Sequence, residues 1–263
     1  MATNYQFLTV ERNGGVERVT LNRPDVRNAF NEHVIAELAA WAMRAHADPP
    51  RVVVLAGAGK VFSAGADAAW MAKMAEYSRE DNVADARAGA EMFLAINTVP
   101  AVVVGRIHGA ALGGGAGLAA VCDIVVTDTD AIFGFTETKL GILPAMISPF
   151  VLQKIGAGAA RDLFLTGRRF TAAKAREIGL VHEVVAAADL DATTDRYVSE
   201  ALTASPTAVA RAKSLIQHVV GKPPADVIDI TADAIASQRV SPDGQEGLKA
   251  FLQKRAPNWT AIQ

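Results

Sequence analysis

The segment Gly109-Ala-Ala-Leu-Gly-Gly-Gly-Ala-Gly-Leu118 places three consecutive glycines between a strand-like run and an alanine-rich, helix-like run. Three glycines in a row are costly in backbone entropy, so they indicate a place where the backbone must approach another group closely. At the start of a helix, backbone N–H groups point outward and the helix dipole favours negative charge. The segment therefore predicts an anion site, which could hold either a bound phosphate or a developing oxyanion.

Strand and helix patterns alternate around this segment. A hairpin is predicted at Asn13-Gly14-Gly15, and Asn31 is placed to cap a helix. A polar, helix-prone segment covers residues 78–97. This alternation predicts an α/β fold. The continuous apolar runs that indicate buried strands are residues 52–55, 101–104 and 123–126.

After about Gly167 the pattern predicts helices only. The first of these helices is capped by Thr171, and later helices are broken at Pro206 and Pro223. We therefore expect two parts, an α/β core over residues 1–195 and a helical region over residues 196–263.

Composition and charge exclude several classes of protein. The formal net charge of −2 gives no basic surface for a nucleic acid. The least polar stretch, residues 99–126, contains Arg106 and Asp123, which argues against a membrane span. The single cysteine, Cys122, suits a reducing compartment and is expected to be a small buried side chain. No secretory signal or metal-ligand spacing is visible, so we expect a cytoplasmic protein without nucleic-acid or membrane partners.

A dinucleotide site is the first alternative to consider, because Gly115-Ala-Gly117-Leu-Ala-Ala120 matches G-x-G-x-x-A and Glu137 follows about twenty residues later. In a dinucleotide fold the first glycine follows the strand directly, and the acidic residue ends the next strand. Here the first strand ends near Ile107, and Glu137 lies well past Val126. The spacing disfavours this alternative.

Three separated segments together resemble the crotonase (enoyl-CoA hydratase/isomerase) family. They are residues 62–67 (Phe-Ser-Ala-Gly-Ala-Asp), 109–115 and 133–144, with supporting matches at Leu21-Asn-Arg-Pro24, Asn28-Ala29 and the tail from Glu246-Gly247 to Trp259. The resemblance implies a spiral of β-β-α units to about residue 195, followed by a helical region that assembles trimers or dimers of trimers. It also implies an acyl-CoA thioester as the substrate, with no metal or redox cofactor.

Within that family, residues 63–71 and 137–150 resemble bacterial 3-methylglutaconyl-CoA hydratases and related hydratases of branched isoprenoid acyl-CoA breakdown. This narrower resemblance implies reversible hydration of a branched, carboxylated 2-enoyl-CoA.

The resemblance also implies the site. Two backbone N–H groups, those of Ala66 and Gly114, would hold the thioester oxygen while negative charge develops on it. Glu137 would be the acid/base group, and apolar neighbours such as Phe133 and Leu140 would raise its pKa. The other residues implied in substrate or CoA binding are Val26, Arg27, Ala64, Gly65, Asp67, Trp70, Gly113 and, toward the CoA of a neighbouring subunit, Phe251 and Lys254.

The chain departs from the two-glutamate hydratases of this family at one position. Their first glutamate corresponds to Gly117, which has no side chain. A hydratase that relies on Glu137 remains the expectation, with a Δ3,Δ2-enoyl-CoA isomerase as the alternative, because one glutamate suffices to move a proton between C2 and C4. A non-catalytic acyl-CoA-binding protein is a further alternative.

Overall fold

The predicted hairpin begins the main sheet of the computed structural model, which describes residues 5–260. Strands β1 (Leu8–Asn13) and β2 (Val16–Leu21) pair antiparallel, and Asn13 lies opposite Val16 across the two-glycine turn. Both the hairpin and its turn are confirmed.

Six strands form this sheet in the order β1-β2-β3-β4-β6-β9, and every pair after the hairpin is parallel. The three predicted buried strands are confirmed and extend slightly further than expected. They are β3 (Val52–Gly57), β4 (Val102–Ile107) and β6 (Ile124–Asp128). The last strand of the sheet is β9 (Glu183–Val185).

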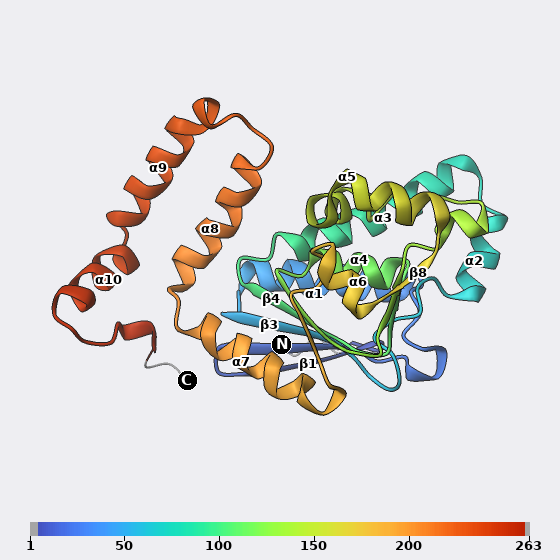
Figure 1. The fold of residues 1–263 in the computed structure, drawn as a ribbon, viewed down its shortest axis with the longest axis horizontal. Coiled ribbons are helices and arrows are strands. Elements are labelled where there is room, and N and C mark those ends of the chain that lie inside the picture. Colours follow the sequence, from blue (N-terminus) through green and yellow to red (C-terminus); the bar gives the residue numbers. More distant parts are fainter. Residues whose placement is uncertain (1–4, 261–263) are drawn as a thin grey trace.

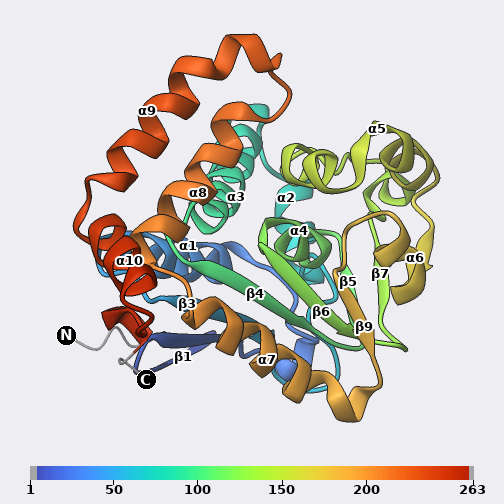
Figure 2. The ribbon, with the colours of Figure 1, turned by 60° about the vertical axis from the view of Figure 1, so that its left-hand side comes forward.

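Helices cover both faces of the sheet, as Figure 2 shows. Because successive side chains of a strand point to opposite faces, Val53 and Leu55 belong to the large core, whereas Val52 and Val54 pack with Val198 of α7. The large core is shared with α1 (Glu32–Ala47), α3 (Arg79–Asn97) and α4 (Gly114–Val121), and α7 spans Leu190–Leu202.

Side-chain caps fix where the helices begin. The Asn31 side chain accepts a hydrogen bond from Val34 N at 3.0 Å, as its place in the sequence predicts. The Ser78 and Thr171 hydroxyls cap α3 and α6 (Ala172–Glu177) in the same way. Cys122, at the end of α4, is buried as expected, and burial raises the pKa of its thiol to about 12.

A second, three-stranded sheet holds β5 (Ala110–Leu112), β7 (Ile132–Gly134) and β8 (Arg169–Thr171). The prediction that only helices follow Gly167 is wrong, because β8 and β9 lie beyond it. Each has three residues, too few for the alternation of polar and apolar side chains to be recognised. Helix α2 (Ala68–Ala75) lies in a stretch that shows no clear periodic pattern.

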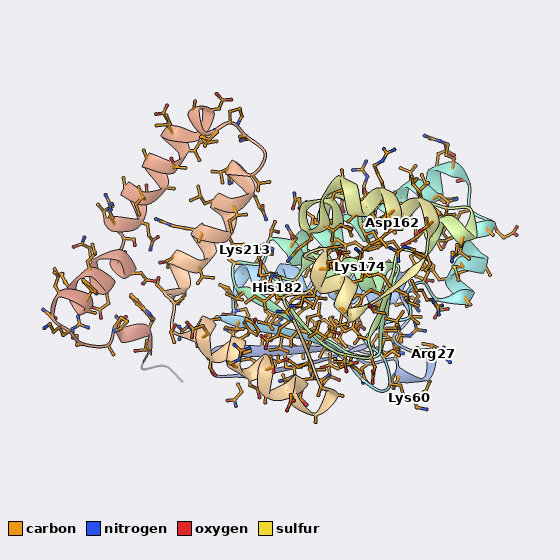
Figure 3. The ribbon with its side chains drawn as sticks, in the orientation of Figure 1. Arg27, Lys60, Asp162, Lys174, His182 and Lys213 are labelled. Atoms are coloured by element: carbon orange, nitrogen blue, oxygen red, sulfur yellow. The ribbon has the colours of Figure 1, made fainter. Side chains whose placement is uncertain are left out.

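The C-terminal helices form an arm that projects from the core (Figure 1). Lys213 (labelled in Figure 3) anchors the arm to the core. Its Nζ lies 2.7 Å from Oδ2 of Asp123, the residue before β6. The predicted boundary at residue 195 falls within α7, which packs on the sheet, and the division into two parts stays a prediction. The arm consists of α8 (Pro206–Val219), α9 (Ile228–Arg239) and α10 (Pro242–Leu252), with short 3-10 turns at Pro224–Val227 and Asn258–Thr260.

The remaining elements are a 3-10 turn after β2, a second one after β7, the long helix between β7 and β8, and the turn that precedes α7. They are Pro24–Val26, Glu137–Leu140, α5 (Ser148–Thr166) and Ala187–Asp189. Across residues 5–260, no helix combines the length and the apolar character that crossing a membrane requires.

Candidate active site

Strand pairing brings the three characteristic segments together. Strand β5 runs parallel to β7, and Ser63 forms an isolated parallel bridge to Ala111 in β5. Residues 62–67 therefore lie on one side of β5, and the segment that follows β7 lies on the other. Because parallel strands point the same way, the chain leaves all three segments at the same edge.

The loop of residues 62–67 directs the backbone N–H of Ala66 away from the neighbouring segment at Phe30. On either side of Ala66, Gly65 O accepts from Phe30 N at 2.7 Å and Asp67 N donates to Phe30 O at 2.7 Å. Ala66 itself is exposed, and within residues 5–260 its N–H has no acceptor. A backbone donor fixed on both sides and left unpaired is available to a ligand oxygen.

Gly114 presents the second free donor. Gly113 N donates to Gly134 O at 2.8 Å, which ties the glycine run to the end of β7, and α4 begins at the next residue. The first N–H groups of a helix have no acceptor inside it, and the dipole places partial positive charge there. The N–H of Gly114 is thus oriented by the helix, as the sequence predicts.

Glycines are required where the two donor segments meet. Gly65 has φ +94°, and a methyl group on it would lie 3.0 Å from Leu112 O. Gly113 has φ +51°, and a methyl group there would lie 3.3 Å from Glu137 Oε1. The left-handed backbone at both positions strains any residue with a side chain, and a Cβ there would also have to push its neighbours aside. The same crowding places the Glu137 carboxylate directly beside the backbone of Gly113.

Glu137 stands at the start of the 3-10 turn Glu137–Leu140, just after β7. Its Oε2 is buried and has no hydrogen-bond partner within the described part of the chain. Burial raises the pKa of this carboxyl above its usual value, as expected. A carboxylate that is desolvated, unpaired and raised in pKa suits general acid/base chemistry.

We expect activity to fall on acidification with the titration of Glu137. The base must be ionised, and its pKa lies above the ordinary value of 4.5, so kcat/KM should decline as pH falls through that raised pKa. The pH profile of kcat/KM measures it. A decline with an apparent pKa at or below 4.5 would contradict the assignment.

A cavity of about 230 Å³ joins these groups. Ala66, Gly114 and Glu137 all line it, and Glu137 is the only ionisable side chain among the lining residues. The rest of the lining is apolar apart from Thr136, and Leu140 and Leu143 are largely exposed at its edge. The cavity therefore offers two backbone donors and one carboxylate to an otherwise apolar ligand.

Comparison with known proteins agrees with this geometry. The sequence profile described as "Enoyl-CoA hydratase/isomerase" matches residues 11–262.

The chain belongs to the enoyl-CoA hydratase/isomerase family.

Relatives and solved structures of this family align over almost the whole chain. A Thermus thermophilus protein described as an enoyl-CoA hydratase is 35% identical over 94% of this chain and 98% of its own length. The crystal structure of an enoyl-CoA hydratase from Shewanella pealeana has a TM-score of 0.93 at 38% identity, over 97% of this chain and 96% of that one. An enoyl-CoA hydratase/isomerase from Marinobacter aquaeolei has a TM-score of 0.91 at 36% identity, over 97% and 99%. The crotonase fold is confirmed, and the chain is an enzyme of this family.

The enoyl-CoA hydratase/isomerase pocket contains most of the predicted site residues, although their roles stay predictions. Seven of the twelve line the cavity: Ala64, Gly65, Ala66, Trp70, Gly113, Gly114 and Glu137. Trp70 is also buried in the core, with its Nε1 3.3 Å from Asp85 Oδ1, so it serves both packing and pocket.

The other five predicted residues lie outside the cavity. Val26 and Arg27 form an exposed turn beside the loop of residues 62–67, where Ala64 N donates to Arg27 O at 2.9 Å. Figure 3 shows Arg27 and Lys60 at the same end of the molecule. Asp67 caps α2 and pairs with Arg23 at 2.9 Å. The last two, Phe251 and Lys254, lie in or just after α10, on the arm.

Side-chain packing leaves no room for a glutamate at Gly117, the position that corresponds to the first glutamate of the two-glutamate hydratases. A methyl group on Gly117 would overlap Ile147 Cγ2 and would lie 3.1 Å from both Ile147 Cβ and Phe93 Cε1. Ile147 and Phe93 are fully buried, and Ile147 also lines the cavity. The space that a second carboxylate would need is therefore occupied by the hydrophobic core.

Sequence reasoning missed most of the acyl side of the cavity. Its lining includes four of the chain's six methionines, and residues from α1, α2, α3 and the segment before α5. Scattered single methionines carry no spacing signal, so only the fold shows that they meet. The methionines are Met71, which next to Trp70 is a pocket candidate from the sequence, and Met74, Met92 and Met146, which are not.

Proposed function

We propose that this enzyme hydrates the double bond of a 2-enoyl-CoA and uses Glu137 as its single acid/base group. The observation that carries the proposal is Glu137, whose Oε2 is buried without a hydrogen-bond partner in the described part of the chain and whose Oε1 lies beside Gly113 in an otherwise apolar cavity. The N–H groups of Ala66 and Gly114 would hold the thioester oxygen and stabilise the enolate. The predicted absence of a metal or redox cofactor remains part of the proposal.

One carboxylate can complete the reaction. Glu137 takes a proton from water as the water oxygen bonds to C3, and the C2–C3 π electrons move to the thioester enolate. The resulting carboxylic acid then gives that proton to C2, which restores the carboxylate. The raised pKa of Glu137 suits both proton transfers, because the carboxylate must first accept a proton from water and then give it to C2.

The lining favours an uncharged acyl chain. The narrower sequence resemblance suggests a carboxylated substrate such as 3-methylglutaconyl-CoA, but among the lining residues the only charge is the negative one on Glu137. A second carboxylate in this cavity would be desolvated beside a like charge, which is unfavourable without a cation. We therefore propose linear or branched alkyl 2-enoyl groups as the preferred substrates.

Isomerisation is the second candidate, and the closed position at Gly117 favours it. A Δ3,Δ2-enoyl-CoA isomerase needs one base that removes a proton from C2 of the 3-enoyl thioester and returns it to C4. Glu137 could do both, and the apolar lining would keep competing water away.

A mass-resolved turnover assay on crotonyl-CoA, 3-methylglutaconyl-CoA and 3-hexenoyl-CoA tests the proposal. Hydration predicts a mass gain of one water on crotonyl-CoA, with a smaller kcat/KM on 3-methylglutaconyl-CoA. Conversion of 3-hexenoyl-CoA to its 2-isomer without added water would instead establish the isomerase. Preference for 3-methylglutaconyl-CoA would contradict the proposed uncharged substrate.

A further inference from the structure

Three side chains and one glycine meet at the inner wall of the acyl cavity. Met146 Sδ would lie 2.6 Å from a methyl group on Gly89, and Ile35 Cδ1 would lie 4.0 Å from it. Gly89 belongs to α3, Ile35 to α1, and Met146 to the segment before α5. All three residues line the cavity with Met92, so they close it on the side of the two helices.

The glycine in this wall has a packing reason. Gly89 lies in the interior of α3, where glycine costs about 1 kcal/mol relative to alanine. It is buried, and its missing side chain leaves the space in which the Met146 thioether rests against the helix. The glycine therefore fixes the position of Met146 at the end of the cavity.

We propose that Met146, seated on Gly89, limits the length of the acyl chain that the enzyme accepts. The inference rests on the proposed acyl-CoA activity and names its specificity-determining residue. The apolar thioether of Met146 rests directly on the buried backbone at Gly89, so a short acyl chain can pack against it and a longer one must displace it. Its side chain is partly exposed, so it is not locked inside the core.

The space behind this wall is suited to a longer chain. Ile35 also lines a groove between α1 and α3, whose apolar side chains are Ala36, Ala39, Met43, Ala88 and Ala95 and whose two charged side chains are Glu32 and Glu91. Apolar side chains thus continue beyond the cavity at Ile35. Truncating Met146 to alanine removes three side-chain atoms from the wall and would lengthen the cavity by about three methylene groups.

The experiment compares kcat/KM for 2-decenoyl-CoA and crotonyl-CoA in the wild-type chain and its variants. In parallel, calorimetry measures the dissociation constants of the unreactive decanoyl-CoA and butanoyl-CoA. Met146→Ala should raise the long-to-short ratio by about 60-fold in both measurements, because each of the three methylene groups newly accommodated contributes about fourfold. Gly89→Ala should lower that ratio, since its methyl group displaces the thioether into the cavity. Leu165→Ala is the control, because Leu165 is 72% exposed and lines neither the acyl cavity nor the groove between α1 and α3.

The outcomes separate this inference from the proposed reaction. An unchanged ratio in Met146→Ala, or an equal loss for both chain lengths, would overturn the role of Met146. A shifted binding ratio without turnover of any substrate would support the inference and refute the reaction. If Met146→Ala fails to fold, Met146→Leu gives the same test with a smaller shift in the same direction.

Discussion

Glu137→Gln is expected to lower kcat by on the order of a thousandfold and to leave acyl-CoA binding almost intact. Glutamine keeps the shape of the side chain but cannot accept a proton from water or from C2. Within residues 5–260, no other ionisable side chain lines the cavity to replace it. Single-turnover kinetics and calorimetry with butanoyl-CoA measure the two effects separately.

The same variant should increase stability at neutral pH. Burial raises the pKa of Glu137 in the folded state, so the unfolded chain binds fewer protons between pH 4.5 and the raised pKa. The free energy of unfolding therefore declines as pH rises through that window. A glutamine, which stays neutral, does not suffer this decline. Urea denaturation should show a higher midpoint for Glu137→Gln at neutral pH and little difference below pH 4.5.

Glu91→Gln is the matched control for Glu137→Gln, because Glu91 lies on α3 with its side chain exposed to solvent. It should change neither kcat nor the urea midpoint. Retention of more than about a tenth of wild-type kcat in Glu137→Gln would contradict a role as general base. Loss of acyl-CoA binding along with kcat would show a binding role instead.

The sequence predicts the parts of this site that rest on backbone constraints. Glycines at positions 65 and 113 are required by left-handed backbone and close approach, and such requirements leave a recognisable pattern. The predicted caps at Asn31 and Thr171 follow the same logic, because each satisfies a specific N–H group. Backbone geometry is local, and local geometry is visible in a sequence.

The acyl side of the cavity could not be predicted in this way. Ile35, Gly89 and Met146 lie on three different elements and meet only through the packing of α1 against α3. Strands β8 and β9 were not predicted because each has only three residues. Their extended conformation depends on pairing with β7 and β6, and a three-residue segment shows no pattern of its own. The substrate-selecting wall is thus a property of tertiary packing.

Gly117→Glu, which supplies the glutamate that two-carboxylate relatives carry, is expected to destabilise the chain by about 3–5 kcal/mol. Its Cβ would overlap Ile147 Cγ2 and press on Phe93, and both side chains are fully buried. The carboxylate would then lack room to reach the cavity without displacing Ile147. Urea denaturation measures the loss, and Gly117→Ala separates the steric part from the cost of the charge.

A compensating substitution shows whether packing alone prevents the second carboxylate. Gly117→Glu combined with Ile147→Ala removes the overlapping methyl group, so the pair should recover part of the lost stability in a non-additive way. If the new carboxylate then reaches the thioester, hydration of crotonyl-CoA should exceed that of Ile147→Ala alone. Wild-type stability in the single Gly117→Glu variant would contradict the argument. The expected result would mean that single-carboxylate chemistry is fixed by the core around Ile147, so that one substitution at Gly117 cannot reverse it.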